Sequence, residues 1–453
     1  MPFIPHTEKD VQSMLATIGV KNVDQLFDEI PPALRQVVAL NAIPEGMSEM
    51  ALGRFAQDRA KLDGELSCFI GAGAYEHHIP AMIWQIATRG EFYTAYTPYQ
   101  AEASQGSLQL IYEFQTMMTR LLAMDVSNAS LYDGASALAE AILMAARLSS
   151  KKEKVSILMP ETIHPHYRAT VEAIVLPKDI TLISVPYEKT TGRIDMAALD
   201  GVMTADVAAL VIPQPNFFGV LEEVDELTRW ARSKAMLVIA VVNPLSMALL
   251  KPPGEWGIDG VDMACGEGQP LGVPLASGGP YYGFLCCKKS HVRHMPGRIV
   301  GRTVDKNGKP GYVLTLQARE QHIRRAKATS NICTNQGLMV TASTIYMSLM
   351  GKMGLQQVAL ASHERAVELK QALSKIPQVT FPFSSPLFHE VVVRFEKSVD
   401  LILAELAKHR IQGGYSLKAI YPALGESLLV CATETKTTED IEQFASKLRA
   451  VVA

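Results

Sequence analysis

The sequence predicts an α/β protein in which a mostly parallel sheet carries helices on both of its faces. Four short apolar runs lack a strict alternation of polar and apolar residues, as expected of strands buried on both faces: 155–159, 180–185, 207–212 and 236–242. Helical patterns over 166–174 and 220–232 lie between these runs. Parallel neighbours in a sheet need such crossover helices, so the alternation predicts βαβ units.

The first sixty residues have a helical pattern. Thr7 with Asp10 three residues later resembles a capping box, and Pro31-Pro32 ends a second helical segment. Apolar residues after the predicted cap then fall on one helical face: Val11, Met14, Leu15 and Ile18. An arm of this kind more often packs on a neighbouring domain or subunit than folds alone. We therefore predict a helical N-terminal arm over residues 1–60.

The remainder of the chain is predicted to form two domains. A large α/β domain over residues 61–335 contains the four strands, together with helices over 108–124 and 135–148. A long helical stretch over 336–376 leads into a small α+β C-terminal domain, residues 336–453. Its predicted strands are 390–395 and 427–432, and its predicted helices are 399–408 and 438–451.

Composition excludes several classes of protein. In 453 residues, 43 Lys and Arg stand against 46 Asp and Glu, which disfavours a basic nucleic-acid binder. No apolar stretch approaches the roughly 18 residues that a membrane span needs. The amino terminus does not have a basic region followed by an apolar one, so it does not read as a secretory signal. We expect a cytoplasmic protein without nucleic-acid or membrane partners.

No metal site is predicted. The six cysteines are scattered without a CxxC pair. The pairs His77-His78 and His164/His166 are not accompanied by an HExxH motif or by a carboxylate triad.

Two loops and one basic segment are candidates for anion binding. Gly134 and Ser136 open a strong helical segment, where backbone N–H groups and the helix dipole favour an anion; an ordinary helix cap by Asp133 is the alternative. A glycine-dense loop over 266–272 predicts a backbone that lies close to a ligand, or else a tight turn. Residues 291–327 hold nine Lys and Arg against two Asp and Glu, which suits a phosphate, an acidic partner or a solvated surface.

Several long strings of the sequence resemble one family. These are YTPYQAE (96–102) with SQG (104–106), PGRIVGR (296–302), REQHIRR (319–325) and KATSNICT (327–334). They resemble the P-protein of the glycine cleavage system, and they are most similar to the amino-terminal half of that enzyme. In two-subunit forms this half is a separate chain, the alpha subunit. The resemblance covers essentially the whole chain.

The resemblance implies a fold, a cofactor and a reaction. The fold is the pyridoxal-phosphate-dependent transferase fold of the aspartate-aminotransferase type. Glycine condenses with pyridoxal phosphate, CO2 is released, and the aminomethyl group passes to the lipoyl arm of the H-protein. The implied partners are a beta subunit in an αβ or α2β2 assembly, the lipoylated H-protein, and indirectly the T-protein and L-protein.

The chain departs from the family's catalytic half at two positions. A pyridoxal enzyme needs a lysine for the Schiff base and usually an aspartate beside the pyridine nitrogen. The resemblance places Gln269 at the lysine position and Asn243 near the aspartate position. An amide cannot form an imine, and Asn cannot supply the carboxylate. We therefore expect no catalytic residue on this chain alone, with the cofactor held covalently by the beta subunit.

These two departures lead to the hypothesis of a shared active site, which this chain completes for its partner. The predicted pocket residues are Tyr96, Thr97, Tyr99, Glu102, Ser330, Asn331, Cys333 and Asn335. Arg298 and Arg302 are predicted to hold a carboxylate or an acidic H-protein surface. Packing between subunits is the alternative role for each of these side chains.

Two other functions are compatible with the sequence. One is a structural or H-protein-docking subunit with no side chain near the chemistry. The other is a stand-alone pyridoxal-phosphate aminotransferase that uses a different lysine, such as Lys288 or Lys327. Lys288 follows a predicted strand, so spacing alone does not exclude it.

Overall fold

The computed structural model describes residues 5–35, 43–150, 154–276 and 278–453. The chain divides into two compact units, Met1–Glu65 and Leu66–Ala453. The boundary predicted at residues 335/336, between a large and a small domain, stays a prediction.

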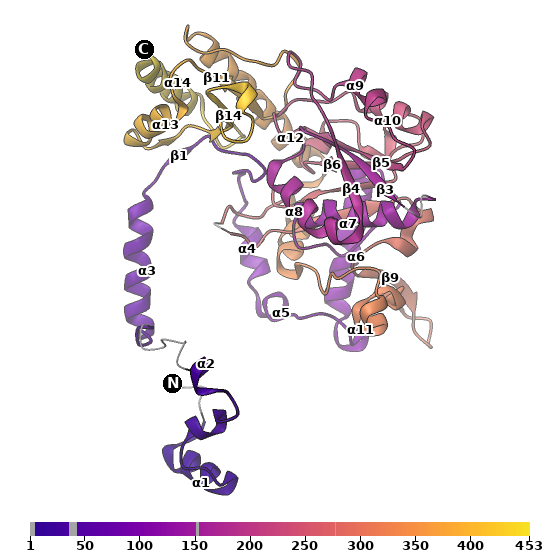
Figure 1. Cartoon of the computed structure of the whole chain (residues 1–453), viewed down its shortest axis with the longest axis vertical. Helices are drawn as coiled ribbons and strands as arrows, with labels where there is room; N and C mark the ends of the chain where they lie inside the picture. The colour runs from indigo at the N-terminus through magenta and orange to yellow at the C-terminus, as the bar shows by residue number, and fades with distance from the viewer. Residues whose placement is uncertain (1–4, 36–42, 151–153, 277) are drawn as a thin grey trace. The chain divides into compact units, whose positions relative to one another are not determined.

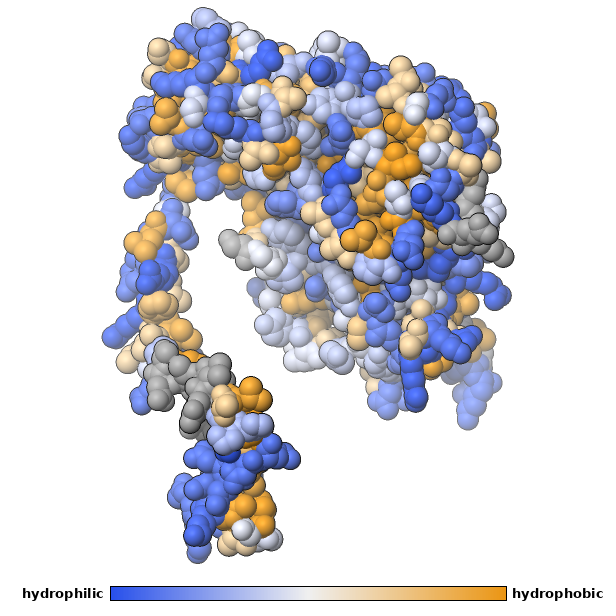
Figure 2. Space-filling model, in the orientation of Figure 1, coloured by the Kyte–Doolittle hydropathy of each residue, from blue (hydrophilic) through white to orange (hydrophobic). Residues whose placement is uncertain are grey.

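The amino-terminal unit is helical in its described part. Its elements are α1 (Glu8–Ile18), a 3-10 turn (Val23–Phe27), α2 (Pro32–Arg35) and α3 (Glu49–Asp63). The predicted capping box is confirmed: the Asp10 N–H donates to Thr7 Oγ1 (3.3 Å), and the Thr7 N–H donates to Asp10 Oδ2 (2.7 Å). Large apolar side chains remain exposed on this unit, among them Ile18, Leu34, Met50 and Leu62, and Figure 2 shows hydrophobic residues along its surface.

A seven-stranded sheet forms the centre of the second unit, in the order β2-β8-β7-β6-β5-β3-β4. β3 to β7 are parallel, whereas β8 runs antiparallel to β7 and β2 runs antiparallel to β8. The four predicted strands are confirmed as β3 to β6. The bounds are β2 (Val126–Ser127), β3 (Val155–Pro160), β4 (Ile180–Val185), β5 (Val207–Gln214), β6 (Leu237–Val242), β7 (Met263–Glu267) and β8 (Gly283–Cys287).

Helices cover both faces of this sheet, as predicted (Figure 1). Alternate side chains of the strands enter two separate cores. Leu158, Leu210 and Val238 pack in the core that also contains residues of α6, α10 and α12. Ile157, Val211 and Ile239 pack in the other core, with residues of α7 and α8. The bounds are α6 (Gln105–Leu122), α7 (Gly134–Leu148), α8 (Pro165–Val175), α10 (Val224–Ser233) and α12 (Gly337–Ser374).

The carboxyl-terminal region has a core of its own. A three-stranded antiparallel sheet, in the order β11-β14-β13, packs against α13, α14 and the second half of α12. The predicted strands and helices of this region are confirmed. The bounds are β11 (Glu390–Arg394), α13 (Val399–Lys408), β13 (Tyr415–Ser416), β14 (Ser427–Cys431) and α14 (Thr438–Val452).

The remaining described elements are short. β1 (Ser67–Cys68) pairs in parallel with β12 (Ile411–Gln412), and β9 (Ile299–Val304) forms a hairpin with β10 (Pro310–Thr315). The second unit also contains several 3-10 turns and, among its described residues, four short α-helices: α4 (Met82–Ala87), α5 (Gly90–Tyr93), α9 (Met196–Gly201) and α11 (Gln321–Arg324).

Candidate functional site

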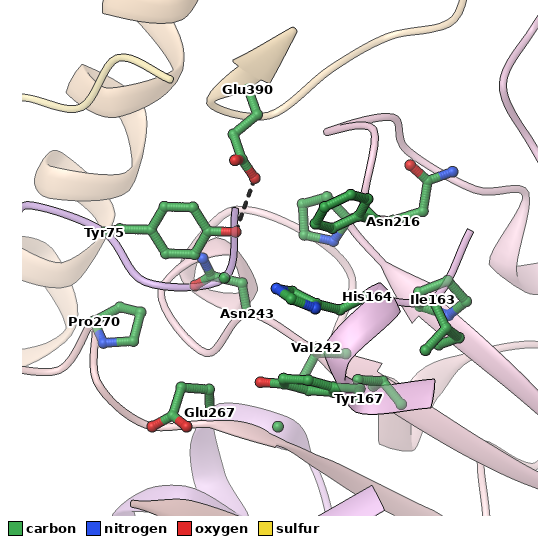
Figure 3. A pocket seen from close by; sticks show the side chains of 16 residues that line it. Tyr75, Ile163, His164, Tyr167, Asn216, Val242, Asn243, Glu267, Pro270 and Glu390 are labelled. Carbon is green, nitrogen blue, oxygen red and sulfur yellow. Dashed lines mark hydrogen bonds between the residues drawn. The ribbon is translucent and has the colours of Figure 1, made fainter. Parts of the chain in front are cut away.

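A small pocket lies at the carboxyl ends of β3, β5, β6 and β7 (Figure 3). Ligands of α/β proteins bind at this edge of a parallel sheet, because the loops that leave the strands converge there. The cavity volume is about 70 Å³, far below the roughly 300 to 1,000 Å³ of small-molecule sites. The lining side chains that carry polar groups are Tyr75, His164, Tyr167, Asn216, Asn243, Glu267 and Glu390.

One wall of the pocket is formed by His164 and Tyr167 at the start of α8. Their rings are stacked, with centroids 5.0 Å apart and an interplanar angle of 24°. His164 Nε2 lies 2.7 Å from the Ala72 carbonyl oxygen, to which the ring N–H donates. Burial lowers the pKa of His164 to about 4, so this ring is neutral at pH 7.

The opposite wall comes from distant parts of the sequence. Glu390, the first residue of β11, accepts hydrogen bonds from the Ala72 N–H (2.7 Å) and from the Tyr75 hydroxyl (2.8 Å). Burial raises the pKa of Glu390 to about 7 and raises that of Tyr75 well above its usual value. At pH 7 the Tyr75 hydroxyl is therefore neutral, and the Glu390 carboxyl group is about half protonated.

The predicted lysine and aspartate positions lie beside this pocket. Gln269 is 1% exposed, and its amide is held at both ends by backbone. Its Nε2 donates to the carbonyl oxygens of Tyr75 and Val273 (2.8 Å each), and its Oε1 accepts from the Tyr75 N–H (2.8 Å). Asn243 follows β6 and lines the cavity, with its Nδ2 3.2 Å from His389 Nε2.

The predicted anion site at Gly134 and Ser136 is filled by carboxyl groups of this chain. The Gly134 N–H donates to Glu267 Oε2 (3.0 Å), and the Ser136 N–H donates to Asp133 Oδ1 (2.7 Å). Asp133 and Ser136 form a capping box, so the ordinary cap that the sequence allowed is present. Anion binding by this helix start stays a prediction.

No lysine is among the described residues that line the pocket. Lys288 follows β8 and is directed at Asp262, with Nζ to Oδ1 at 3.9 Å. Lys327 ends a 3-10 turn and is exposed. Neither residue lines the cavity.

The string over 96–102 lies on a different part of the surface. Tyr96 is 86% exposed, and Glu102 is also exposed. The Thr97 and Thr334 hydroxyls are 3.2 Å apart, so the structure brings this string to the KATSNICT string. The Tyr99 hydroxyl accepts from Arg298 Nη2 (2.8 Å), and the Arg298 guanidinium lies over the Tyr99 ring, 5.2 Å from its centroid.

The string over 330–335 is fixed by hydrogen bonds to its surroundings. The Ser330 hydroxyl accepts from the Ile332 N–H (3.0 Å), and the Asn331 carbonyl accepts from the Gln321 side chain. The Cys333 N–H donates to the Tyr132 hydroxyl (2.7 Å). Asn335 Nδ2 reaches the Ala129 carbonyl at 3.4 Å.

The remaining predicted residues are Arg302 and those beside a hollow next to α7. Arg302 is exposed on the β9–β10 hairpin. Ser136, Ser330 and Asn331 share a wide hollow of about 720 Å³ with Glu140 and Arg147 of α7. Asn243 lines the small pocket, and so do Gly266, Glu267 and Pro270 of the predicted glycine-dense loop; the residues predicted for the shared pocket do not.

Sequence reasoning missed most of the pocket's polar lining. Tyr75, Tyr167, Asn216 and Glu390 carried no prediction of a role. Glu267 was covered only as part of the glycine-dense loop over 266–272, and His164 was considered only as a metal ligand. A usable signal existed for Asn216, because it lies close to the carboxyl end of the predicted strand over 207–212. Glu267 ends β7, a strand that was not predicted. Tyr75 and Glu390 reach the pocket only through long-range folding.

Two features are absent from the described residues. No helix in this part of the chain is long and apolar enough to cross a membrane. Within the same residues, no group of three or more His, Cys, Asp or Glu side chains is placed to hold a metal ion.

Comparison with known sequences gives consistent relatives over the full length. The family model of the glycine cleavage system P-protein matches residues 1–448. A protein of Thioalkalivibrio sulfidiphilus named "Probable glycine dehydrogenase (decarboxylating) subunit 1" is 60% identical over 453 residues, covering 100% of both chains. Proteins with the same name come from Coxiella burnetii (60% over 451 residues) and Nitrosomonas europaea (58% over 453 residues). Both matches cover 100% of this chain, and they cover 100% and 99% of the relative.

Solved structures show the same fold. The crystal structure of a glycine decarboxylase (P-protein) in inhibitor-bound form superposes with a TM-score of 0.88 at 37% identity, and the match covers 100% of both chains. A glutamate decarboxylase of Lactobacillus brevis has the same fold, with a TM-score of 0.69 at 11% identity over 93% of this chain and 96% of that one. The predicted fold class, that of the pyridoxal-phosphate-dependent fold-type I enzymes, is confirmed. The chain belongs to the glycine cleavage system P-protein family.

Proposed function

We propose that this chain is the alpha subunit of a two-chain glycine decarboxylase, glycine dehydrogenase (decarboxylating), and that it is inactive alone. A beta subunit would hold pyridoxal phosphate covalently, in an αβ or α2β2 assembly. The assembled enzyme would release CO2 from glycine and pass the aminomethyl group to the lipoyl arm of the H-protein. The T-protein and L-protein would then act on the loaded H-protein, in the cytoplasm. The name "subunit 1" of the full-length relatives supports this division between chains.

The observation that carries the proposal is the environment of Gln269. Its amide makes three hydrogen bonds to backbone groups, so this position is built for an amide and offers no amine. Asn243 offers no carboxylate to a pyridine nitrogen, and no lysine is among the described lining residues. The residues of this pocket do not fit pyridoxal phosphate, which supports a cofactor on the partner.

The second part of the proposal concerns the two strings on the other surface. Tyr96, Thr97, Tyr99, Glu102, Ser330, Asn331, Cys333 and Asn335 would complete the partner's pocket, beside Arg298 and Arg302. The Thr97–Thr334 contact supports this, because it joins the two strings. The Arg298–Tyr99 hydrogen bond links the buried Arg298 to the first string. An 86% exposed Tyr96 is a large aromatic surface without cover in the single chain, as expected of a residue that meets a partner.

The test of the first part uses the purified chain with pyridoxal phosphate, before and after borohydride, alone and with the beta chain. We expect the reduced label only on the beta chain, and CO2 release from glycine only after mixing. A Schiff-base absorbance band that borohydride fixes on this chain alone would contradict the proposal and would favour an aminotransferase that uses another lysine.

The test of the second part uses alanine variants at Tyr96, Tyr99 and Asn331 in the assembled enzyme. We expect each variant to assemble and to lose about ten-fold or more in turnover, as when groups that position a substrate are removed. Unchanged turnover in all three variants would leave these residues with a packing or docking role only. The exposed Tyr93→Ala, outside the strings, is the matched control and should keep full turnover.

A further inference from the structure

The carboxyl group of Glu267 lies where three separate backbone segments present N–H groups. Its Oε2 accepts from the Gly134 N–H (3.0 Å), and its Oε1 accepts from the N–H groups of Gln269 (3.1 Å) and Tyr282 (3.2 Å). Gly134 is the first residue of α7, a helix of 15 residues. The start of such a helix attracts phosphate groups, because its first N–H groups lack partners within the helix.

The backbone around Glu267 leaves no space for side chains on its neighbours. A Cβ on Gly134 would lie 2.2 Å from the Tyr167 hydroxyl, and one on Gly266 would lie 2.2 Å from the Val242 carbonyl oxygen. A Cβ on Gly268 would lie 1.9 Å from a ring atom of Tyr282. Glu267 is therefore carried to the helix start by two glycines that pack directly on their surroundings.

The Glu267 carboxyl group need not be charged to fill this place. Burial raises its pKa to about 8, and the three hydrogen bonds from backbone N–H groups oppose that rise. At pH 7 the group is mostly protonated, so it satisfies the N–H groups without placing a full charge in the pocket. A phosphate at the same place would be charged at this pH.

We infer that Glu267 occupies the phosphate position of this chain's own pocket and thereby excludes phosphate-bearing ligands from it. The exclusion acts in addition to the absence of a lysine from the described lining residues, and it agrees with a remaining cavity of only about 70 Å³. Replacing Gln269 by lysine and Asn243 by aspartate would therefore not allow pyridoxal phosphate to bind while Glu267 remains. The inference concerns the single chain, so it is independent of the group that the partner carries.

The first experiment measures the thermal midpoint of the full chain while inorganic phosphate is added, at pH 7 and constant ionic strength. For the wild type we expect no shift. For Glu267→Ala we expect a lower midpoint that phosphate raises again, with phosphate binding about ten-fold or more tighter than in the wild type. Asp262→Asn, at a buried carboxyl group that is paired with Arg232 outside the pocket lining, is the matched control and should respond to phosphate as the wild type does.

Glu267→Ser keeps the test decisive if Glu267→Ala does not fold. Its short hydroxyl can accept from one of the N–H groups and still vacates the position of the carboxyl group, so phosphate should raise its midpoint. Equal responses of the wild type and the position-267 variant would overturn the inference. The inference would also be overturned if phosphate raised the midpoint of the wild type but not that of Glu267→Ala.

The second experiment uses pyridoxal phosphate with Gln269→Lys/Asn243→Asp, with and without Glu267→Ala. We expect an absorbance band that borohydride fixes, mapped to position 269 by mass spectrometry, only when Glu267 is also replaced. Equal labelling of the double and triple variants would contradict the exclusion, and so would the absence of label from both.

Discussion

The pKa values of individual pocket residues are determined by burial more than by charge pairs. The pKa of His164 is lowered and those of Glu267 and Glu390 are raised, so each shift favours the neutral form, and burial is the largest cause in each case. The hydrogen bonds that hold these side chains come mostly from backbone groups. The sequence could not predict this, because the Gly134–Glu267 bond joins residues 133 positions apart and the Ala72–Glu390 bond joins residues 318 positions apart.

The raised pKa of Glu390 predicts a pH dependence of stability. The unfolded carboxyl loses its proton near pH 4.5, but the folded one keeps it to about pH 7. Between these values the folded state binds more protons, so the free energy of unfolding should fall as pH rises, by up to about 3 kcal/mol. Glu390→Gln should remove this part of the dependence, because an amide can accept from the Ala72 N–H and donate to the Tyr75 hydroxyl.

Denaturant unfolding from about pH 4 to about pH 8 checks this prediction, since the slope of stability against pH reports proton uptake. The exposed Glu396→Gln serves as the control and should keep the wild-type profile. Parallel pH profiles of the wild type and Glu390→Gln would show that Glu390 does not titrate in this range.

Helices and strands were predictable from the sequence wherever a local pattern of apolar residues determines them. The strands β3 to β6 match the predicted apolar runs to within one or two residues, because strands buried on both faces need such runs. The helix predicted from residue 220 instead begins at Val224. Val220 instead forms an isolated β-bridge with Leu387, and its N–H donates to the side-chain oxygen of the buried Asn216. Long-range contacts of this kind have no local signature.

One helix gives a prediction at this scale. The long α12 is interrupted at Gly351, whose φ of 60° and ψ of −174° lie in a region that is essentially restricted to glycine. Gly351→Ala should therefore lower the free energy of unfolding by about 1 to 3 kcal/mol. Thermal or denaturant unfolding measures this, and the exposed Lys352→Ala should change it little. A Gly351→Ala variant as stable as the wild type would show that the interruption is not needed.

At the scale of the whole molecule, the fold class was predictable and the pocket's content only in part. The resemblance placed Gln269 and Asn243 at chemically important positions, and both are at the carboxyl-end edge of the sheet. It did not indicate that the other predicted residues lie on a separate surface, because a string of sequence carries no information about which cavity it faces. Under the proposed function, their role depends on a second chain.

The division into two units predicts how the molecule tolerates truncation. Removing residues 1–65 should leave the remainder with a cooperative thermal transition, its midpoint within a few degrees of the full chain. Affinity for the beta chain should fall, because the removed unit exposes many large apolar side chains. Calorimetry and a binding titration measure the two effects. A midpoint lowered by more than about 10 °C would show that the second unit depends on the first.

The distribution of thiols makes this chain suitable for site-directed labelling. All six cysteines are free, and Cys333 is exposed, whereas Cys265, Cys286, Cys287 and Cys431 are buried and Cys68 is half-buried. Burial raises the pKa of Cys286 to about 12 and raises those of the other three buried thiols. Since the thiolate is the reactive form, a maleimide fluorophore should attach first at Cys333. The native sequence thus offers a reporter inside the KATSNICT string, where its emission would register the arrival of the beta chain without any engineered residue.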